Sequence, residues 1–306
     1  MNRMLDNLLE QKTLVKEYLR KDRHSLSSFS FAAIFNWQDF FEFEFKMIKG
    51  NLCIFARNEM GVFLYLPPLG KMIEEETIEQ CFLLMNEENK GRGLSRIENV
   101  SSDQLEAFSS LRYSFYRKGF EYGYFRKDIA FLKGNSYKSK RSSCNHFVKN
   151  YKFEYLPFDP AMLAGCLDLY DDWAGTRRQL YADEIYRQML MENRRVHEIT
   201  LRHSEDLDLT GRVVRVNGQI KAYTFGFEIN QDIFCVLFEI ADVSVKGLPV
   251  FIFSRFCRDE ALRKYNFINV MDDCELKNIQ AVKLSFHPVL VFPLYVIEER
   301  KESKID

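Results

Sequence analysis

Hydrophobic and polar positions alternate in a regular order in the second half of the chain. An apolar run at 211–216 is separated by Asn217-Gly218 from a longer run at 220–229, and a polar break precedes a third run at 233–240. Asn-Gly between two apolar runs is the strongest short-range signal for a β-hairpin. The pattern therefore predicts an antiparallel meander of three strands.

The residues after this meander predict a crossover. A loop at 241–249 is followed by an apolar helical pattern to about Lys264, and then by a short apolar run, 267–271, that ends at the acidic pair Asp272 and Asp273. A strand that returns from a helix usually lies beside the strands that precede the helix. We therefore expect the run at 267–271 to extend the sheet of the meander.

The first half repeats this order. Apolar runs at 41–46, 52–56 and 62–66 are separated by short polar breaks, and a helical pattern follows at 74–86. The repetition predicts an α/β (α+β) protein with two domains of one architecture, each a mixed, mostly antiparallel sheet flanked by helices. The predicted domains are residues 1–135 and 136–306.

Composition limits the classes of function. The 306 residues are 46% hydrophobic with a formal net charge of -1, so no global field directs the chain to nucleic acid or to an anionic membrane. No run of about 18 apolar residues occurs, which predicts no transmembrane segment. The seven cysteines are scattered without a CxxC pair, which is typical of a reduced, cytoplasmic protein.

The most distinctive local chemistry lies between residues 133 and 152. This segment has no acidic residue and interleaves aromatic with basic side chains. A helix beginning near Ser136 would direct backbone N–H groups outward, and that combination suits phosphate groups. The alternative is a solvated linker helix whose basic side chains cover apolar surface. The basic residues are Lys133, Lys138, Lys140, Arg141, Lys149 and Lys152.

Carboxylates are the candidates for acid–base chemistry. Glu239 lies inside an apolar strand, where an unpaired carboxylate is costly, so either its pKa is perturbed or it pairs with Arg215 or Lys283. Asp272 and Asp273 follow a buried strand, where one of them could accept a proton from an incoming amine. Their alternative roles are an N-cap for a helix at 277–285 or an ion pair with Lys283. The five histidines show no metal-ligand spacing, so we expect no metal site.

Two blocks of residues resemble a known family. Tyr122-Gly-Tyr124, Leu132-Lys-Gly134, Tyr137, Lys140-Arg141, Asn145, Phe147 and Tyr151 form the first block, and Phe267-Ile-Asn269, Asp272-Asp273 and Lys283-Leu-Ser285-Phe286-His-Pro288 form the second. Both resemble signatures of the phosphatidylglycerol lysyltransferase C-terminal domain family. The likeness extends from about Ser27 to Tyr295.

The resemblance implies tandem GNAT-type acyltransferase folds, similar to the Fem peptidyltransferases. It implies transfer of an activated, tRNA-borne acyl group to an amine or hydroxyl acceptor, with tRNA meeting the basic patch and with peripheral lipid contact. The expected catalytic residues are Glu239, Asp272, Asp273 and Lys283. The expected substrate- and phosphate-binding residues are Tyr137, Lys140, Arg141, Asn145, Lys246 and Asn269.

The chain departs from the family pattern at several positions. Cys274 stands where the family has glycine, and Ile279-Gln280 stands where it has Leu-Arg. The loop 243–249 contains one glycine, Gly247, and Pro249 lacks a backbone N–H group, so we expect acyl-coenzyme A to be a less suitable donor than a tRNA-borne or another activated acyl group. The alternative function is a catalytically silent module that keeps the fold and binds a ligand.

Overall fold

The computed structural model describes residues 8–90, 92–180 and 184–300. Its backbone contacts divide the chain into two compact units. The first comprises residues 1–121, 272–276 and 291–306, and the second comprises 122–271 and 277–290. The units therefore do not coincide with the segments 1–135 and 136–306, because the chain returns to the first unit near its end.

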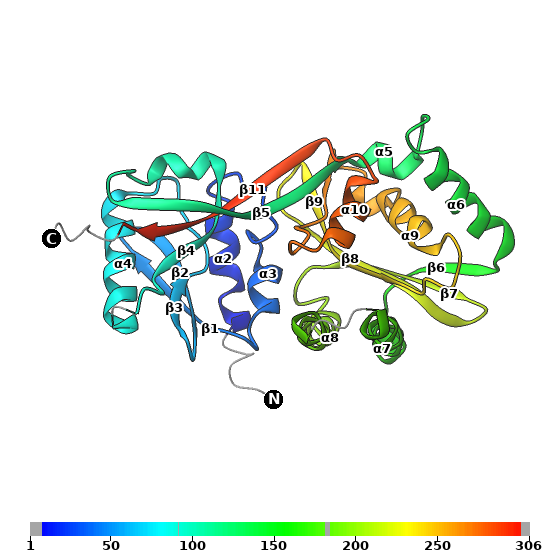
Figure 1. Ribbon diagram of the computed structural model, residues 1–306, viewed down its shortest axis with the longest axis horizontal. Helices are drawn as coiled ribbons and strands as arrows, with labels where there is room; N and C mark the ends of the chain where they lie inside the picture. The colour runs from blue at the N-terminus through cyan, green and yellow to red at the C-terminus, as the bar shows by residue number, and fades with distance from the viewer. Residues whose placement is uncertain (1–7, 91, 181–183, 301–306) are drawn as a thin grey trace. The chain divides into compact units, whose positions relative to one another are not determined.

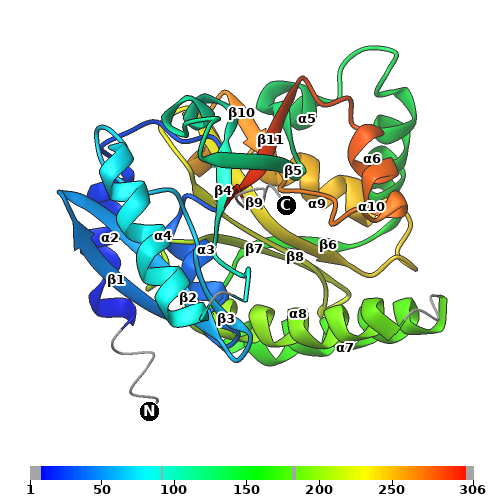
Figure 2. The ribbon, with the colours of Figure 1, turned by 60° about the vertical axis from the view of Figure 1, so that its left-hand side comes forward.

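The first unit consists of a meander with helices on both faces. Figure 2 shows α4 and α2 on opposite sides of β1, β2 and β3. Its elements are α2 (Lys12–Leu19), α3 (Phe31–Asn36), β1 (Glu42–Ile48), β2 (Asn51–Asn58), β3 (Gly61–Leu64), α4 (Glu75–Asn89), β4 (Arg96–Ser101), the 3₁₀ turn η1 (Ser102–Ala107), most of β5 (Tyr113–Phe125) and most of β11 (Leu290–Glu299).

The second unit has two hydrophobic cores on opposite faces of its strands. Helices α7 and α8 lie on one face, and α6 and α9 lie on the other (Figure 1). Its elements are α5 (Arg126–Phe131), α6 (Lys138–Asn150), β6 (Phe153–Pro157), η2 (Pro160–Met162), α7 (Leu163–Leu180), α8 (Glu184–Arg202), β7 (Thr210–Val216), β8 (Gln219–Glu228), β9 (Ile233–Ala241), α9 (Leu248–Cys257), η3 (Glu260–Leu262), β10 (Phe267–Asn269) and α10 (Lys277–Leu284).

The strands follow a single hydrogen-bonded order, β1-β2-β3-β4-β11-β5-β10-β9-β8-β7-β6. Over the described residues the protein is thus an α+β fold with one mixed sheet of eleven strands and flanking helices. Each unit has the same pairing scheme within that order. In the first, β1, β2 and β3 are antiparallel and β4 is parallel to β3; in the second, β7, β8 and β9 are antiparallel and β10 is parallel to β9.

The first hairpin of each meander has the same two-residue turn. Lys49-Gly50 and Asn217-Gly218 have positive φ angles of 47°, 86°, 51° and 83° in that order. Positive φ at both central residues is the geometry that matches the twist of the flanking strands. The hairpin predicted from Asn217-Gly218 is confirmed by the β7–β8 pairing. The strand predicted at 267–271 as an extension of the sheet is confirmed by β10, which ends at Asn269 and lies parallel to β9.

Other elements differ from the sequence-based expectation. The helix expected to reach about Lys264 ends at Cys257, because Asp259 accepts a hydrogen bond from Ala261 N and starts the 3₁₀ turn η3. The patterns also did not predict β5, β6 or β11. Two of these contain or end at proline, Pro157 in β6 and Pro293 in β11, and proline interrupts the alternation by which a strand is recognised.

Candidate functional site

Strands β9 and β10 separate after three residue pairs. Phe267, Ile268 and Asn269 pair with Ile233, Phe234 and Cys235, and β10 ends there. Strand β9 continues to Ala241 and remains paired with β8. From 236 to 241, the edge of β9 that faced β10 therefore has no strand partner in the described part of the chain. Such an edge offers backbone N–H and C=O groups to a ligand.

Glu239 lies in this unpaired stretch of β9. Its register partner on β8 is Thr224, which is fully buried. The Oε2 atom of Glu239 is shielded from solvent and has no hydrogen-bond partner among the described residues. Burial raises the pKa of the Glu239 carboxyl to about 8. The carboxyl is therefore protonated for much of the time at neutral pH and is able to exchange a proton.

Lys283 does not form the expected ion pair with Glu239. Its Nζ atom donates instead to the backbone carbonyls of Val270, at 2.7 Å, and Met271, at 3.1 Å. These carbonyls directly follow β10, so the ammonium group is held at the end of that strand. Asn269, fully buried, supports the same backbone through its Oδ1, which accepts from Met271 N at 2.7 Å.

The acidic pair lies in a short turn that belongs to the first unit. Asp273 is buried, and its Oδ1 accepts from Glu275 N at 3.0 Å. Asp272 Oδ1 accepts from the Cys274 thiol at 3.4 Å. The carboxylates thus shape the turn that precedes α10, and Cys274 and Glu275 both have positive φ, 50° and 58°. The family's glycine at the position of Cys274 suits this backbone.

The candidates on and before α6 make contacts within the second unit. Tyr137 Oη donates to Phe286 O at 2.8 Å, and Lys140 Nζ donates to Ser285 Oγ at 2.7 Å and lies 4.0 Å from the centre of the Phe286 ring. Burial lowers the pKa of Lys140. Arg141 donates to Leu132 O and, at 3.0 Å, to Gly134 O. These side chains join the start of α6 to the end of α10 and to the loop after α5.

Asn145 and Lys246 are exposed. The hydrogen bonds described above do not join either of them to another predicted site residue. The loop that carries Lys246 packs against α6. A Cβ atom added to Gly247 would lie 2.1 Å from the carbonyl oxygen of Ser143. The single glycine of this loop therefore allows α9 to pack closely against α6. A coenzyme A pyrophosphate would need the same backbone to be open to its phosphates.

The structure brings the predicted residues into two groups. Tyr137 and Lys140 both bind residues just after α10, and Asn269 and Lys283 both bind the backbone just after β10. Sequence reasoning missed Ser285 and Phe286 as their partners, although both stand in the second motif block. It also missed Thr224 beside Glu239, which no motif marks.

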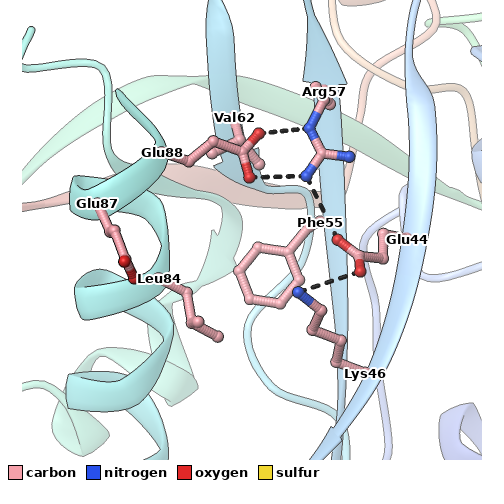
Figure 3. Close-up of a pocket in the computed structure, with 8 residues that line it drawn as sticks. All are labelled: Glu44, Lys46, Phe55, Arg57, Val62, Leu84, Glu87 and Glu88. Carbon is pink, nitrogen blue, oxygen red and sulfur yellow. Dashed lines mark hydrogen bonds and ion pairs between the residues drawn. The ribbon is translucent and has the colours of Figure 1, made fainter. Parts of the chain in front are cut away.

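A surface cavity of about 150 Å³ lies elsewhere, in the first unit. Figure 3 shows the Arg57 guanidinium between the carboxylates of Glu44 and Glu88, with Lys46 beside Phe55. Lys46 Nζ is 3.0 Å from Glu44 Oε1, so four of the five charged side chains that line this cavity pair with one another; the fifth is Glu87. None of the residues predicted for the site lines it.

The described residues contain no group of three histidine, cysteine, aspartate or glutamate side chains that could hold a metal ion. In the same residues, no helix is both long and apolar enough to cross a bilayer.

Solved structures with a similar fold cover nearly the whole chain. A conserved protein of unknown function from Bacteroides thetaiotaomicron is 27% identical with a TM-score of 0.82, covering 95% of this chain and 97% of its own. The L-PGS protein from Bacillus licheniformis is 16% identical with a TM-score of 0.66, covering 95% and 93%. FemX is 8% identical with a TM-score of 0.60, covering 93% and 95%. At these lower identities the likeness shows the fold.

The family comparison covers most of the sequence. No curated protein matches the chain. The family model described as phosphatidylglycerol lysyltransferase, C-terminal, matches residues 20–298. The match includes both motif blocks and every residue predicted for the site, and the chain belongs to the phosphatidylglycerol lysyltransferase C-terminal family.

Proposed function

We propose that the protein is an acyl or aminoacyl transferase built from two GNAT-like units, and that the second unit is catalytic. The observation that carries the proposal is Glu239, a shielded carboxyl with a pKa of about 8 on the unpaired stretch of β9. A group whose pKa lies near the working pH is suited to general base catalysis. Kinship with families of aminoacyltransferases supports the same class of reaction.

In the proposed reaction, an amine or hydroxyl attacks the carbonyl carbon of an activated ester. Glu239 as carboxylate takes the proton of the attacking group while the new C–N or C–O bond forms. The ester C–O bond then breaks, and the proton moves to the leaving hydroxyl. Lys283, held at the end of β10, supplies positive charge for the developing oxyanion. Asp272 and Asp273 remain predicted participants that orient the acceptor.

The proposed donor is aminoacyl-tRNA, with its phosphates near Lys140 and Arg141 on α6. The packing of Gly247 against Ser143 supports this choice over acyl-coenzyme A, since it occupies the backbone approach that a pyrophosphate needs. The first unit is a poorer donor site. The loop between β3 and α4 contains Pro67-Pro68. These two residues lack the backbone N–H groups that could otherwise bind a phosphate of the acyl donor. Six buried cysteines that form no disulfide in the described residues also fit the proposed cytoplasmic setting.

The decisive experiment compares wild type with Glu239→Gln. Purified protein is mixed with a pool of labelled aminoacyl-tRNAs and either a lipid extract or a peptide acceptor, and label in the acceptor is measured. We expect Glu239→Gln to lower kcat/KM by at least about a hundredfold, because general bases contribute about 10²–10⁴. The control is Glu154→Gln, an exposed glutamate on β6 of the same unit.

The pH profile gives an independent measure. The wild-type rate should rise with pH and level off above about 8, since the base acts only when deprotonated. If wild type binds charged tRNA but transfers nothing to either acceptor, the chain is a silent binding module. If Glu239→Gln and Glu154→Gln are equally active, Glu239 is not the base.

A further inference from the structure

Helix α4 lies over strand β2 in the first unit, and the side-chain contacts between them advance in step. Near the start of both elements, Thr77 Oγ1 donates to Asn51 Oδ1 at 3.2 Å. Four residues of a helix and two residues of a strand cover almost the same length, about 6.0 and 6.6 Å. The residues that follow Thr77 and Asn51 by these steps are Cys81 and Cys53. The register of the helix on the strand therefore places the two cysteines opposite each other.

The two thiols touch in the core. Cys81 Sγ lies 3.5 Å from Cys53 Sγ and donates a hydrogen bond to it, and both residues are fully buried. Further along, Arg57 Nη2 donates to Glu88 Oε2 at 2.7 Å, so the helix stays on the same face of the strand. We call this line of contacts the α4–β2 seam. The contact between the thiols is thus held in place by hydrogen bonds on both sides of it.

The surroundings of the pair make it slow to react but well positioned. The hydrogen bond with Cys53 and the burial both raise the pKa of the Cys81 thiol, so little of the reactive thiolate forms. A bond between the sulfurs would require their distance to shorten from 3.5 Å to about 2.05 Å. Rotation about the two Cα–Cβ bonds can supply this approach. The pair therefore stays reduced until an oxidant reaches it, and it is then ready to close.

The α4–β2 seam is loosely filled one helical turn beyond the pair. The cavity of about 150 Å³ described above is lined by Leu84, three residues after Cys81, and by Phe55, two residues after Cys53 (Figure 3). A cavity of this size has room for several molecules as small as water. A small oxidant can therefore come within about one turn of the thiols, and a local opening of α4 would complete its path.

We propose that Cys53 and Cys81 form an oxidisable dithiol, and that hydrogen peroxide converts it to a disulfide that fastens α4 to β2. One sulfur takes an oxygen from the peroxide as the O–O bond breaks, which gives a sulfenic acid and one water. The other sulfur then attacks the first, the S–O bond breaks and a second water leaves. The two thiols lose two electrons and two protons, which the peroxide accepts. This modification site lies in the first unit and does not depend on the proposed function.

The test is treatment of the folded protein with hydrogen peroxide, followed by peptide mapping without reduction. Cys274 is exposed and is first blocked with iodoacetamide. We expect a linked peptide that contains Cys53 and Cys81, lacks two hydrogen atoms and is separated by dithiothreitol. The link should form at least about tenfold more slowly than Cys274 is oxidised in unblocked protein, and faster as pH rises, because the reactive thiolate is scarce in the core.

Single substitutions and thermal melts test the link and its effect. Cys53→Ala and Cys81→Ala should each abolish the linked peptide, whereas Cys166→Ala, which removes an equally buried thiol from the second unit, should leave it unchanged. Oxidation should raise the melting temperature of wild type by about 5–10 °C, because the link joins residues 28 apart and restricts the unfolded chain. The melting temperature of Cys81→Ala should not rise.

The peptide map of wild type decides the proposal even where an alanine variant is too unstable to study. Cys53 and Cys81 that stay unlinked, long after unblocked Cys274 is fully oxidised, would overturn it. So would a link from either cysteine to a different thiol, since that would mean that the contact in the seam does not direct the reaction. A linked protein that melts no higher than the reduced one would show that the bond strains the seam and does not fasten α4.

Discussion

At the scale of single residues, the Glu239 carboxyl is the group in the candidate site whose surroundings differ most from water. Its Oε2 is shielded and lacks a hydrogen-bond partner among the described residues. Removing a carboxylate from water favours its protonated form, which is why its pKa rises from 4.5 to about 8. The same burial that suits it for proton transfer should also make the folded state sensitive to pH.

Glu239→Gln tests this sensitivity without any substrate. Between pH 4.5 and about 8 the unfolded chain loses the Glu239 proton and the folded chain keeps it, so wild-type stability from this group should fall as pH rises through that range. The amide cannot ionise, so at pH 8 the variant should be more stable than wild type by about 2–4 kcal/mol. Urea unfolding at pH 5 and pH 8 measures the difference. Equal pH dependence in both proteins would show that Glu239 is hydrated.

The sequence motifs mark candidate residues but do not predict their contacts. The motif blocks contain Tyr137, Lys140 and Lys283, but a sequence does not show where a long side chain reaches. Lys140 spans from α6 to Ser285, and Lys283 turns to the carbonyls after β10. An ion pair of Lys283 with Glu239 was a reasonable expectation from charge alone. The carbonyls compete successfully because they follow β10 directly and lie within 3.1 Å.

At the scale of elements, the strands marked by strong turns were predicted and the others were not. Asn217-Gly218 fixes the β7–β8 hairpin because both residues adopt positive φ. Strand β5 has no such signal. In its first half, two apolar residues are followed by two basic ones from Phe115 to Lys118, all exposed, so apolar and polar positions do not alternate there. The parallel pairing of β10 with β9 could be predicted from the intervening helix, but its early end at Asn269 could not.

The contact between α6 and α9 depends on one glycine. Gly247 has φ +90°, and an added Cβ would approach Ser143 O to 2.1 Å. Gly218 has a similar φ of +83° with nothing within 4 Å of an added Cβ. Gly218→Ala should therefore cost only the backbone strain, about 1 kcal/mol. Gly247→Ala should cost the same strain plus the clash with α6, about 2–4 kcal/mol in total.

Chemical unfolding of both glycine variants measures the two costs. A larger loss for Gly247→Ala would support the view that this glycine serves packing. Equal losses would mean that α6 yields easily. In that case the loop 243–249 would be open to a phosphate, and the argument against acyl-coenzyme A would lose its physical basis.

At the scale of the whole molecule, the two units share a pairing scheme but differ in chemistry. Each has an antiparallel meander, a helix and a strand parallel to the last strand of the meander. In the first unit the chain after β3 contains Pro67-Pro68, and four of the five charged side chains that line its cavity pair with one another. The second unit has the shielded carboxyl and the basic helix. The molecule therefore uses one pairing scheme twice, and under the proposed function the second unit supplies the general base.

Donor binding at the basic helix is the remaining prediction, and it concerns Lys140 and Arg141 together. Both already donate hydrogen bonds within the protein, to Ser285 and to Leu132 and Gly134. Lys140→Ala with Arg141→Ala should therefore lower the melting temperature. If these charges also hold a tRNA phosphate, affinity for charged tRNA should fall by at least about tenfold at a temperature where the variant is folded.

The matched control is the adjacent cationic pair on α7, Arg177→Ala with Arg178→Ala, which removes the same charge from another helix. Wild-type binding should weaken with salt, since counterions compete for the same phosphates, and the salt dependence should be shallower in the Lys140/Arg141 variant only. A fluorescence titration with charged tRNA beside a thermal melt separates the outcomes. A lower melting temperature with unchanged affinity would leave Lys140 and Arg141 the single role of fastening α6 to its neighbours, and the donor would have to bind elsewhere on the second unit.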